Sequence, residues 1–283
     1  MMDNEKWKPK TLEELCVDAS PTINLNLCHS LIPKETVAIS FGLSLEYEKL
    51  INLFVTNMEQ RTENKDGLAF NLNEFKPITP EVLNRELLLK CKKIYEKESS
   101  RKRYVDEQFK KIGKNLEFVS IRRKKYIGSF NSVVLDFDNA QAPYIRPETV
   151  RNLLPGDMSY IMHNTYSSSL ERPKFRAIIP LAKPENSCYY WMLFSPLLRV
   201  IDPDGVHINQ GRIDPTCAQE WRFFYFPNFR VGSENSVIGE ISEQDDPWII
   251  TNRGKFYDGY AAQMESRFYN LQKLKHFRGK KNG

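Results

Sequence analysis

The chain has 283 residues, of which 41% are hydrophobic and 27% are charged, and its formal net charge is +5. This composition supplies a core of ordinary size and excludes a globally disordered chain. Its five cysteines form no C-x-x-C pair, which disfavours a disulfide framework and a zinc ribbon. The opening "MMDNEKWKPK" has no apolar signal core, and the longest apolar run, Tyr189–Ile201, is too short to span a bilayer. We therefore expect a soluble, cytoplasmic protein without a membrane partner.

Residues 1–114 are expected to form a mostly helical, basic N-terminal region. Prolines spaced through residues 1–35 predict irregular structure, and Glu35–Ser44 has the pattern of a strand ended by glycine. Leu45–Gln60 has the apolar spacing of an amphipathic helix. Thr79 is a predicted N-cap before Pro80, so a further helix is expected from there to Gly113, with a break near Ser99 and Ser100.

A block of positive charge covers Lys90–Lys125, where 14 Lys or Arg stand against 5 Asp or Glu, a local net charge of +9. A block of this kind favours a polyanionic partner, most simply nucleic acid. The alternative is a lysine-rich helix face that only meets solvent. The residues predicted to bind nucleic acid are Arg101, Lys102, Arg103, Arg122, Arg123, Lys124 and Lys125.

Residues 115–250 mix strands with helices, which predicts an α+β (mixed α/β) fold. After Pro247 the chain becomes more polar, and residues 251–283 are expected to form a polar, basic C-terminal tail that frays. The predicted elements are a strand, a basic turn containing Gly128 and a second strand over residues 116–140, a helix over Arg146–Leu154, strands over Met158–Ser168 and Pro173–Ala182, a buried helix over residues 185–201 that bends or ends near Pro196, and a strand over Glu220–Phe229.

The stretch "NSVVLDFDNA" ends an apolar strand with Asp136 and Asp138. Residues i and i+2 of a strand share one face and stand about 6.6 Å apart along it. Two carboxylates placed in this way can bridge divalent cations roughly 3.5–4 Å apart, an arrangement used in nucleotidyl and phosphoryl transfer. The alternative is a strand that runs out into a polar loop, with both aspartates solvated or capping.

Two further segments carry polar groups suited to a phosphorylated substrate. In "YSSSLERPKFRAIIPLA", the hydroxyls of Ser167 and Ser168 can bond phosphate oxygens, while Lys174 and Arg176 share one strand face. A hairpin with a polar edge strand would look the same. In "RIDPTCAQEWRFFYFP", Asp214 begins a turn and Arg222 enters an aromatic strand. Asp214 is the candidate third carboxylate, and Asp202 and Asp204 are its competitors.

The order of these three segments resembles the archaeo-eukaryotic primase superfamily, especially the primase or primase-polymerase domains of phage and plasmid replication proteins. The resemblance covers Tyr126–Phe229, with looser similarity back to Glu35. It implies an RRM-like catalytic core packed against a second α/β lobe, with the active site in the cleft between them. It also implies that Asp136, Asp138 and Asp214 hold two Mg²⁺ or Mn²⁺ ions. Arg176 would then lie near the triphosphate, and Arg222 would precede the aromatic strand.

The second motif departs from the family pattern, which has a histidine that contacts the incoming nucleotide. Ser168 occupies that place here, and His163 lies five residues upstream. The missing histidine puts catalytic efficiency, and activity itself, in question.

The resemblance predicts a DNA primase or primase-polymerase of a phage, plasmid or mobile element. Its partners would be a single-stranded DNA template, NTP or dNTP, and a separate replicative helicase, since the chain has no G-x-x-x-x-G-K-[ST] loop. The alternative is a catalytically degenerate, primase-fold replication initiator or accessory subunit that binds DNA. A nicking initiator with a catalytic tyrosine is disfavoured, because the four histidines form no His-hydrophobe-His pair.

Overall fold

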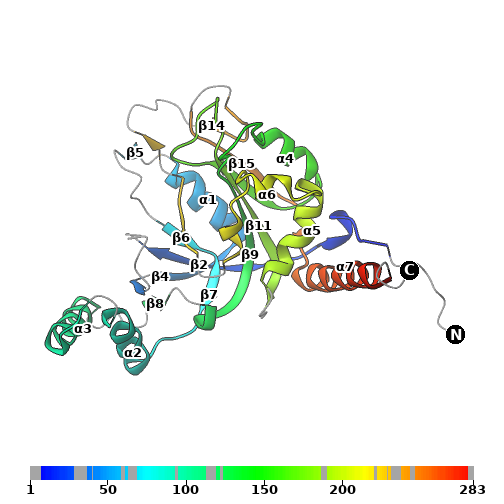
Figure 1. Cartoon of the computed structure of the whole chain (residues 1–283). Helices are drawn as coiled ribbons and strands as arrows, with labels where there is room; N and C mark the ends of the chain where they lie inside the picture. Colours follow the sequence, from blue (N-terminus) through cyan, green and yellow to red (C-terminus); the bar gives the residue numbers. More distant parts are fainter. Residues whose placement is uncertain are drawn as a thin grey trace.

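The computed structural model describes residues 8–28, 37–39, 41–58, 61–62, 69–92, 95–112, 119–121, 124–185, 190–219, 222–227, 229–230, 237–242 and 246–279. Within these ranges the fold is α+β, as the sequence predicts, with a curled mixed sheet at its centre and helices around it (Figure 1). None of the described helices combines the length and the apolar character that crossing a membrane requires.

The larger sheet is built around two long antiparallel strands, β9 (Ile127–Phe137) and β11 (Phe175–Glu185). Strand β9 also pairs with β7, and β11 continues into the rest of the sheet in the order β1-β16-β11-β10-β15-β14. The bounds of these other strands are Cys16–Val17 for β1, Asn73–Phe75 for β7, Tyr160–Asn164 for β10, Val237–Ile238 for β14, Trp248–Asn252 for β15 and Phe256–Tyr257 for β16.

Strand register places three polar residues in one row across this sheet. His163 of β10 lies opposite Arg176 of β11, and Arg176 lies opposite Asp136 of β9. Directly opposed residues project from the same face, so all three side chains stand on one side of the sheet. Leu135 alternates with Asp136 and is fully buried on the other face.

A second sheet of four strands follows the order β12-β6-β2-β4. Its strand β2 (Thr22–Cys28) lies in the segment expected to be irregular, so that prediction was wrong for these residues and for Cys16–Val17 of β1. Alternation of the buried Ile23 and Leu25 with more polar neighbours outweighs the prolines, and Pro21 merely precedes the strand. The remaining bounds are Phe41–Glu46 for β4, Ala69–Asn71 for β6 and Phe224–Tyr225 for β12, beside two small pairs, β3 (Val37–Ile39) with β8 (Val119–Ile121) and β5 (Arg61–Thr62) with β13 (Phe229–Arg230).

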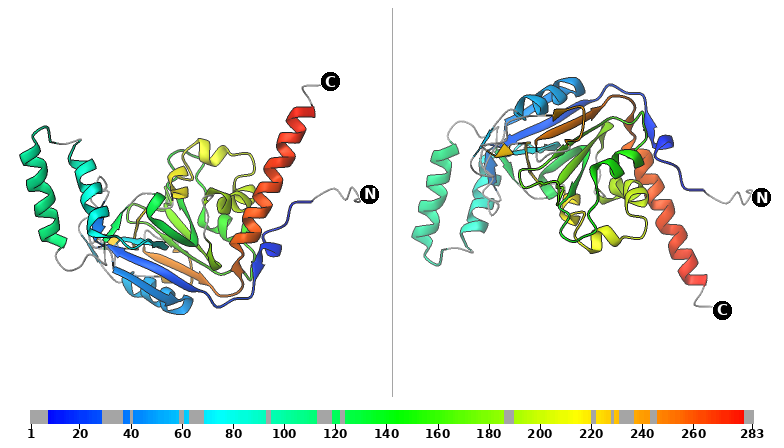
Figure 2. Two further views of the ribbon diagram at one scale, coloured as in Figure 1. Left: turned by 90° about the horizontal axis from the view of Figure 1, so that it is seen from below. Right: turned by 90° about the horizontal axis from the view of Figure 1, so that it is seen from above.

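The helices predicted within residues 1–114 are present, but strands β1 to β7 lie in the same region, so its described part is mixed and not mostly helical. Helix α1 (Tyr47–Asn57) follows β4, and the Thr79 hydroxyl accepts the Val82 N–H at the start of α2 (Pro80–Cys91). Helix α3 (Glu98–Ile112) starts after the expected break. Helices α2 and α3 project together as a hairpin at the opposite end from α7 (Figure 2). They have their own small hydrophobic cluster, formed by Ile78, Leu83, Leu87, Cys91, Val105, Ile121 and Tyr126.

The C-terminal part differs from the polar tail that we expected over residues 251–283. Strand β15 extends to Asn252, β16 follows, and Gly259–Gly279 form helix α7, which packs on α5 (Trp191–Ile201). Apolar residues hidden among the charges explain the error: Phe256, Tyr257 and Ala262 are all buried. Helix α7 also carries a buried hydroxyl, Ser266, that its partner helix requires.

Helix α5 does not end at Pro196, which lies inside it. Proline lacks the N–H that would bond the carbonyl four residues earlier, so the Met192 carbonyl loses its helical donor. The Ser266 hydroxyl of α7 donates to that carbonyl at 2.7 Å. A tertiary contact thus replaces the missing hydrogen bond and allows the helix to continue.

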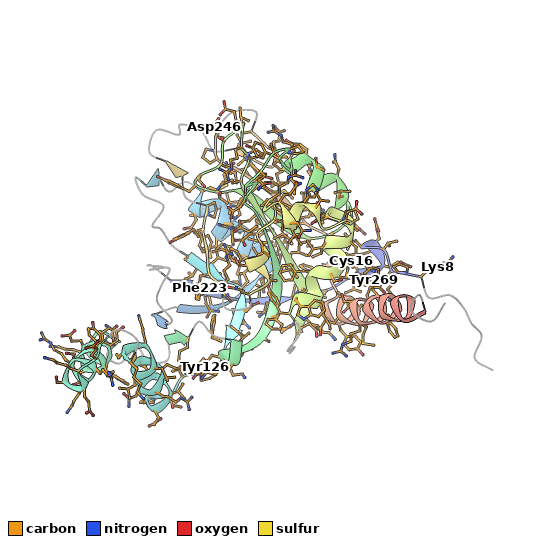
Figure 3. All side chains as sticks on the ribbon, in the orientation of Figure 1. Lys8, Cys16, Tyr126, Phe223, Asp246 and Tyr269 are labelled. Atoms are coloured by element: carbon orange, nitrogen blue, oxygen red, sulfur yellow. The ribbon has the colours of Figure 1, made fainter. Side chains whose placement is uncertain are left out.

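Two other local expectations are corrected by the structure. Gly128 lies within β9 and not in a turn, and its missing side chain leaves room for Glu74, whose carboxylate accepts the Ser129 hydroxyl at 2.7 Å. The basic turn is the short 3₁₀ helix Lys124–Tyr126 directly before it, at the base of the α2–α3 hairpin, where Figure 3 labels Tyr126. Among the described residues of the strand expected over Glu220–Phe229, Phe224–Tyr225 form β12 and Phe229 begins β13. Before β12, the Arg222 carbonyl accepts the Asn71 side-chain amide instead of a strand partner.

Candidate metal centre

Three carboxylates from two distant segments meet beside the end of β9. Asp136 is in β9, Asp138 directly follows it, and Asp214 caps the 3₁₀ helix η4 (Pro215–Ala218). One ligand oxygen from each lies within 4.8 Å of the others, and we call this group the carboxylate triad. The Asp214 N–H donates to the Asp136 carbonyl at 2.9 Å, which ties η4 to the strand. Asp202 and Asp204, the competitors of Asp214, are not in the group.

Arg176 holds the innermost carboxylate from the neighbouring strand. Its Nε donates to Asp136 Oδ1 at 3.0 Å, and both side chains are more than nine-tenths buried. Its Nη1 donates to the Tyr225 carbonyl at 2.9 Å, so the guanidinium also anchors the start of the aromatic segment. The register of β9 with β11 fixes this pair, because the two residues lie directly opposite each other.

Arg222 bridges two members of the carboxylate triad. Its Nη1 lies 2.6 Å from Asp214 Oδ2, and its Nη2 lies 3.3 Å from Asp136 Oδ2. The Asn71 amide donates to the Arg222 carbonyl at 2.6 Å, which fixes the backbone from which the guanidinium extends. The ring of Phe224 packs against the guanidinium of Arg222 at 5.2 Å, and against that of Arg176 at 5.3 Å.

Asp138 is the accessible member of the triad. Its side chain is 48% exposed, and its ion pair with Lys174 is long, at 3.6 Å. The sequence prediction that Lys174 and Arg176 share a site with these carboxylates is consistent with their positions, since each contacts a different aspartate. Asp138 is therefore the carboxylate that an incoming cation would meet first.

The pKa values of Asp136 and Asp214 are shifted in opposite directions. Burial raises the pKa of Asp136, and the charges of Arg176 and Arg222 only partly oppose it. For Asp214, burial also acts to raise the pKa, but the N–H and hydroxyl of Thr216, together with Arg222, outweigh it and lower the pKa. Among the described residues, three cationic side chains stand against the three carboxylates and balance their charge without a metal ion.

The loop after the triad is held by residues that sequence reasoning missed. Asn139 has a positive φ of 47° and is fully buried. Its N–H donates to the Arg212 carbonyl at 3.1 Å, and its amide bonds the main chain at Ile145 and Pro173. Arg212 returns hydrogen bonds to the carbonyls of Gln141 and Ala142. The available signal was an asparagine directly after a strand, because Asn tolerates the left-handed region.

Serines of the second motif build a turn, and within the described part of the chain they make no hydrogen bond to the triad. The Ser168 hydroxyl accepts the Lys174 N–H at 2.9 Å, and its own N–H donates to the Thr165 carbonyl. Ser167 is half-buried. His163 is fully buried against Phe54, with ring centroids 5.8 Å apart, and its Nδ1 lies 2.7 Å from the Asn164 carbonyl. His163 therefore lies in the core behind Arg176, and it does not replace the missing histidine at an open site.

The basic residues predicted to bind nucleic acid divide into two groups. Lys102 and Arg103 are exposed on α3, and Arg103 pairs with Glu107 at 3.0 Å. Arg101 instead donates to the carbonyls of Tyr95 and Glu96, and Lys125 lies 2.7 Å from the buried Glu86 carboxylate. Arg122, Arg123 and the side chain of Lys124 lie outside the described residues.

Comparisons with family models, with curated proteins and with solved structures found no match to this chain.

Proposed function

We propose that the chain is a DNA primase or primase-polymerase of a phage, plasmid or mobile element. It would join NTP or dNTP on a single-stranded DNA template, beside a separate replicative helicase. The observation that supports this most is the convergence of Asp136, Asp138 and Asp214 from two segments of the order that the resemblance requires. The RRM-like core and second lobe belong to the same proposal.

The donor set of the carboxylate triad suits Mg²⁺ or Mn²⁺. These hard cations prefer carboxylate oxygen ligands, and the three carboxylates come within 4.8 Å of one another. Metal ions held there would lower the pKa of an attacking hydroxyl and balance the charge of the triphosphate. Two of the three aspartates have arginine partners, so Asp138, with only a long contact to Lys174, offers the entry point.

Lys174 and Arg222 are the side chains best placed to receive a phosphate. Their exposed fractions are 18% and 23%, against 9% for the side chain of Arg176. Arg176 already donates to Asp136 and to the Tyr225 carbonyl, so it positions the carboxylate and the aromatic segment. A triphosphate near the triad would therefore be oriented by Lys174 and Arg222, with Arg forming the bidentate contacts.

A catalytically degenerate DNA-binding module remains the second candidate, and one observation favours it. The three carboxylates are matched by three cationic partners, so the described part of the site has no excess negative charge to attract a metal ion. Ser168 stands where the family has its histidine, and its hydroxyl is used in a turn. In this reading the triad is a structural ion-pair network that joins β9, β11 and η4.

Primer synthesis on unprimed single-stranded DNA tests the choice. Wild type, Asp138→Asn and the matched control Asp18→Asn would be compared with labelled NTP or dNTP and with Mg²⁺ or Mn²⁺. Asp138 is the best variant because its weak pairing makes its loss harmless to folding, and Asp18 is an exposed aspartate outside the triad. Product that disappears only in Asp138→Asn supports the enzyme. If the wild type is folded and binds DNA but makes no product under any of these conditions, the result supports the DNA-binding module instead.

A further inference from the structure

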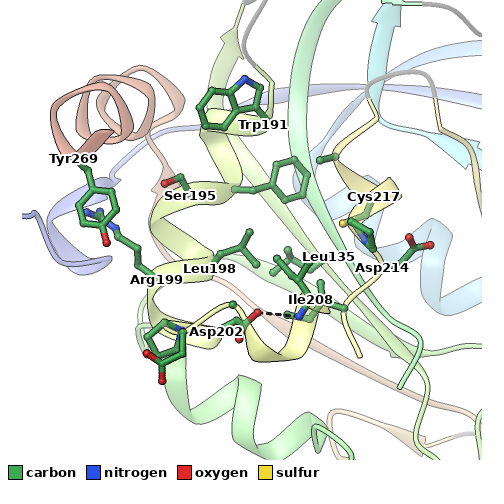
Figure 4. A pocket seen from close by; sticks show the side chains of 17 residues that line it. Leu135, Trp191, Ser195, Leu198, Arg199, Asp202, Ile208, Asp214, Cys217 and Tyr269 are labelled. Atoms are coloured by element: carbon green, nitrogen blue, oxygen red, sulfur yellow. Dashed lines mark hydrogen bonds between the residues drawn. The ribbon is translucent and has the colours of Figure 1, made fainter. Parts of the chain in front are cut away.

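A cavity of about 490 Å³ lies behind the carboxylate triad, between helix α5 and η4 (Figure 4). Leu135 of β9 lines the cavity. Because Leu135 and Asp136 are neighbours in the strand, their side chains project from opposite faces, so the cavity lies on the face of β9 opposite the Asp136 side chain. The other walls come from α5, from the segment around the short helix α6 (Val206–Asn209), from η4 and from Tyr269 of α7. This volume is in the range of small-ligand sites.

The cavity is lined mainly by apolar and aromatic groups. Leu198 of α5 and Cys217 of η4 lie on different sides of it (Figure 4), and Phe194 and Ile213 also line it. Trp191 stands at the rim with 47% of its surface exposed, unusually high for an indole beside a hydrophobic core. An exposed indole next to apolar walls favours a flat aromatic ligand, which would bury ring surface on the Trp191 side of the cavity.

Charges on the walls exclude an anionic group inside the cavity. Arg199 is paired with the buried Glu265 at 2.9 Å and packs over Tyr269 at 4.9 Å. Both oxygens of Asp202 accept main-chain N–H groups of α6 at 2.9 Å. Among the described lining residues, no unpaired cation is left to receive a phosphate. The ligand's ring therefore lies inside, and any phosphate it carries stays in solvent.

Two polar groups remain to fix the orientation of such a ring. The Ser195 hydroxyl and the Asp204 carboxylate line the cavity, and neither has a hydrogen-bond partner among the described residues. Together they can donate one hydrogen bond and accept several. A ring that carries both N–H donors and acceptor nitrogens or oxygens on its edge matches this pair.

We propose that the cavity binds a nucleobase. A nucleobase is flat, uncharged and carries donors and acceptors on its edge, as the walls require. Other flat, uncharged rings with donors and acceptors on their edge would also fit, and the choice of a nucleobase among them rests on the proposed function. The base comes either from a free nucleotide or from an unpaired strand, because the chemistry inside the cavity is the same for both.

Position gives this site a connection to the carboxylate triad. Pro215 and Cys217 of η4 line the cavity, and so does Asp214 at the start of η4, which also belongs to the triad. The Asp214 N–H is bonded to the Asp136 carbonyl of β9. A base packed against η4 would thus support the segment that holds Asp214 in place.

The test is a titration of the full chain with 2-aminopurine riboside, a fluorescent purine that is quenched when it stacks on an indole. Trp191→Ala removes the stacking partner, and Ser195→Trp fills the cavity from the surface of α5. Each should weaken binding about tenfold or more, the loss expected for one stacking side chain. The matched control, Tyr260→Ala, removes an exposed aromatic residue outside the cavity and should change nothing. If Ser195→Trp does not fold, Ala218→Phe fills the same cavity from η4.

The outcomes separate this inference from the proposed function. Quenching that survives in both Trp191→Ala and Ser195→Trp, or no quenching by wild type, overturns the cavity site. Quenching lost in Asp138→Asn but kept in Ser195→Trp places the base at the triad and also overturns it. Mn²⁺ binding and primer synthesis are measured on the same preparations and report the proposed function independently.

A second arm identifies the source of the base. A single-stranded oligonucleotide with one 2-aminopurine among abasic sites is compared with 2-aminopurine riboside triphosphate. Tighter, cavity-dependent quenching by the oligonucleotide supports a strand as the source, and tighter quenching by the triphosphate supports a free nucleotide. If neither probe is affected by Ser195→Trp, the inference fails.

Discussion

Asp136 and Arg176 face each other across two central strands, and Arg176 Nε lies 3.0 Å from Asp136 Oδ1. Both side chains are buried, so water cannot solvate the charge of one residue if its partner is removed. This makes Asp136 a structural residue as well as a candidate metal ligand. Like-charge repulsion within the triad alone would predict that removing Asp136 stabilises the protein, but its two arginine partners reverse that expectation.

Arg176→Gln should lower the free energy of unfolding by about 3 kcal/mol, because it leaves the Asp136 charge buried with only the longer contact to Arg222. Urea denaturation followed by circular dichroism measures this loss. Arg253→Gln is the matched control, since it breaks an exposed arginine pair with Glu48 and should cost about 1 kcal/mol or less. Equal effects of the two variants would contradict the structural role of the buried pair.

Asp138→Asn should weaken Mn²⁺ binding about tenfold or more while it changes the free energy of unfolding by only about 0.5 kcal/mol. The side chain is 48% exposed and its contact with Lys174 is long, so little native energy depends on it. Titration of free Mn²⁺ by electron paramagnetic resonance measures the binding. Wild-type affinity in this variant would remove Asp138 from the metal centre, and no Mn²⁺ binding by wild type would favour the ion-pair network.

Local rules predicted much of the site, because the signals were local. The apolar run before Asp136 predicted a strand, and the order of segments drew attention to Asp214 rather than Asp202. The sequence identified Arg176 and Arg222 as site residues, but it did not predict which carboxylate each of them contacts. Which carboxylate each arginine contacts depends on strand register and on the fold of residues 214–225, which no local pattern contains.

Predictions of secondary structure were wrong where a residue distant in sequence compensates for a proline or glycine that would otherwise interrupt a helix or strand. Pro196 continues a helix because Ser266 supplies the donor it lacks, and Gly128 stays in a strand beneath Glu74. The C-terminal residues were predicted to be a tail because most of them are polar or charged, and the few that are buried, such as Tyr257, do not stand out in the sequence. In each case tertiary contacts override local propensity.

Lys102→Glu should weaken binding of single-stranded DNA and make its dependence on salt less steep, by a slope of about 1 for one lost phosphate contact. Lys102 is exposed on the projecting helix α3 and has no ion pair among the described residues. Fluorescence anisotropy at several salt concentrations gives the slope. The control is Lys49→Glu, an exposed lysine of α1 at another place on the molecule. A similar loss in both variants would indicate a general charge effect and not a binding surface on α3.

His163 should make the protein less stable as the pH falls. Complete burial, and then the nearby charge of Arg176, lower its pKa to about 3, whereas its ordinary value is 6.5. At a pH between these two pKa values, His163 is protonated in the unfolded chain and neutral in the folded chain, so acid favours unfolding. The contribution is about 1.4 kcal/mol for each pH unit below roughly pH 6, and it vanishes above pH 7.

His163→Leu removes this titration and keeps a side chain suited to the buried position. Its free energy of unfolding should rise relative to wild type as the pH is lowered from 7 to 5, when both are measured by urea denaturation at each pH. The two proteins should differ by a constant amount above pH 7, where His163 is neutral in both folded and unfolded chains. Parallel curves across the whole range would mean that His163 gains a proton in the folded protein near its ordinary pKa. Such a result would require water or an anion beside Nε2, which has no hydrogen-bond partner among the described residues.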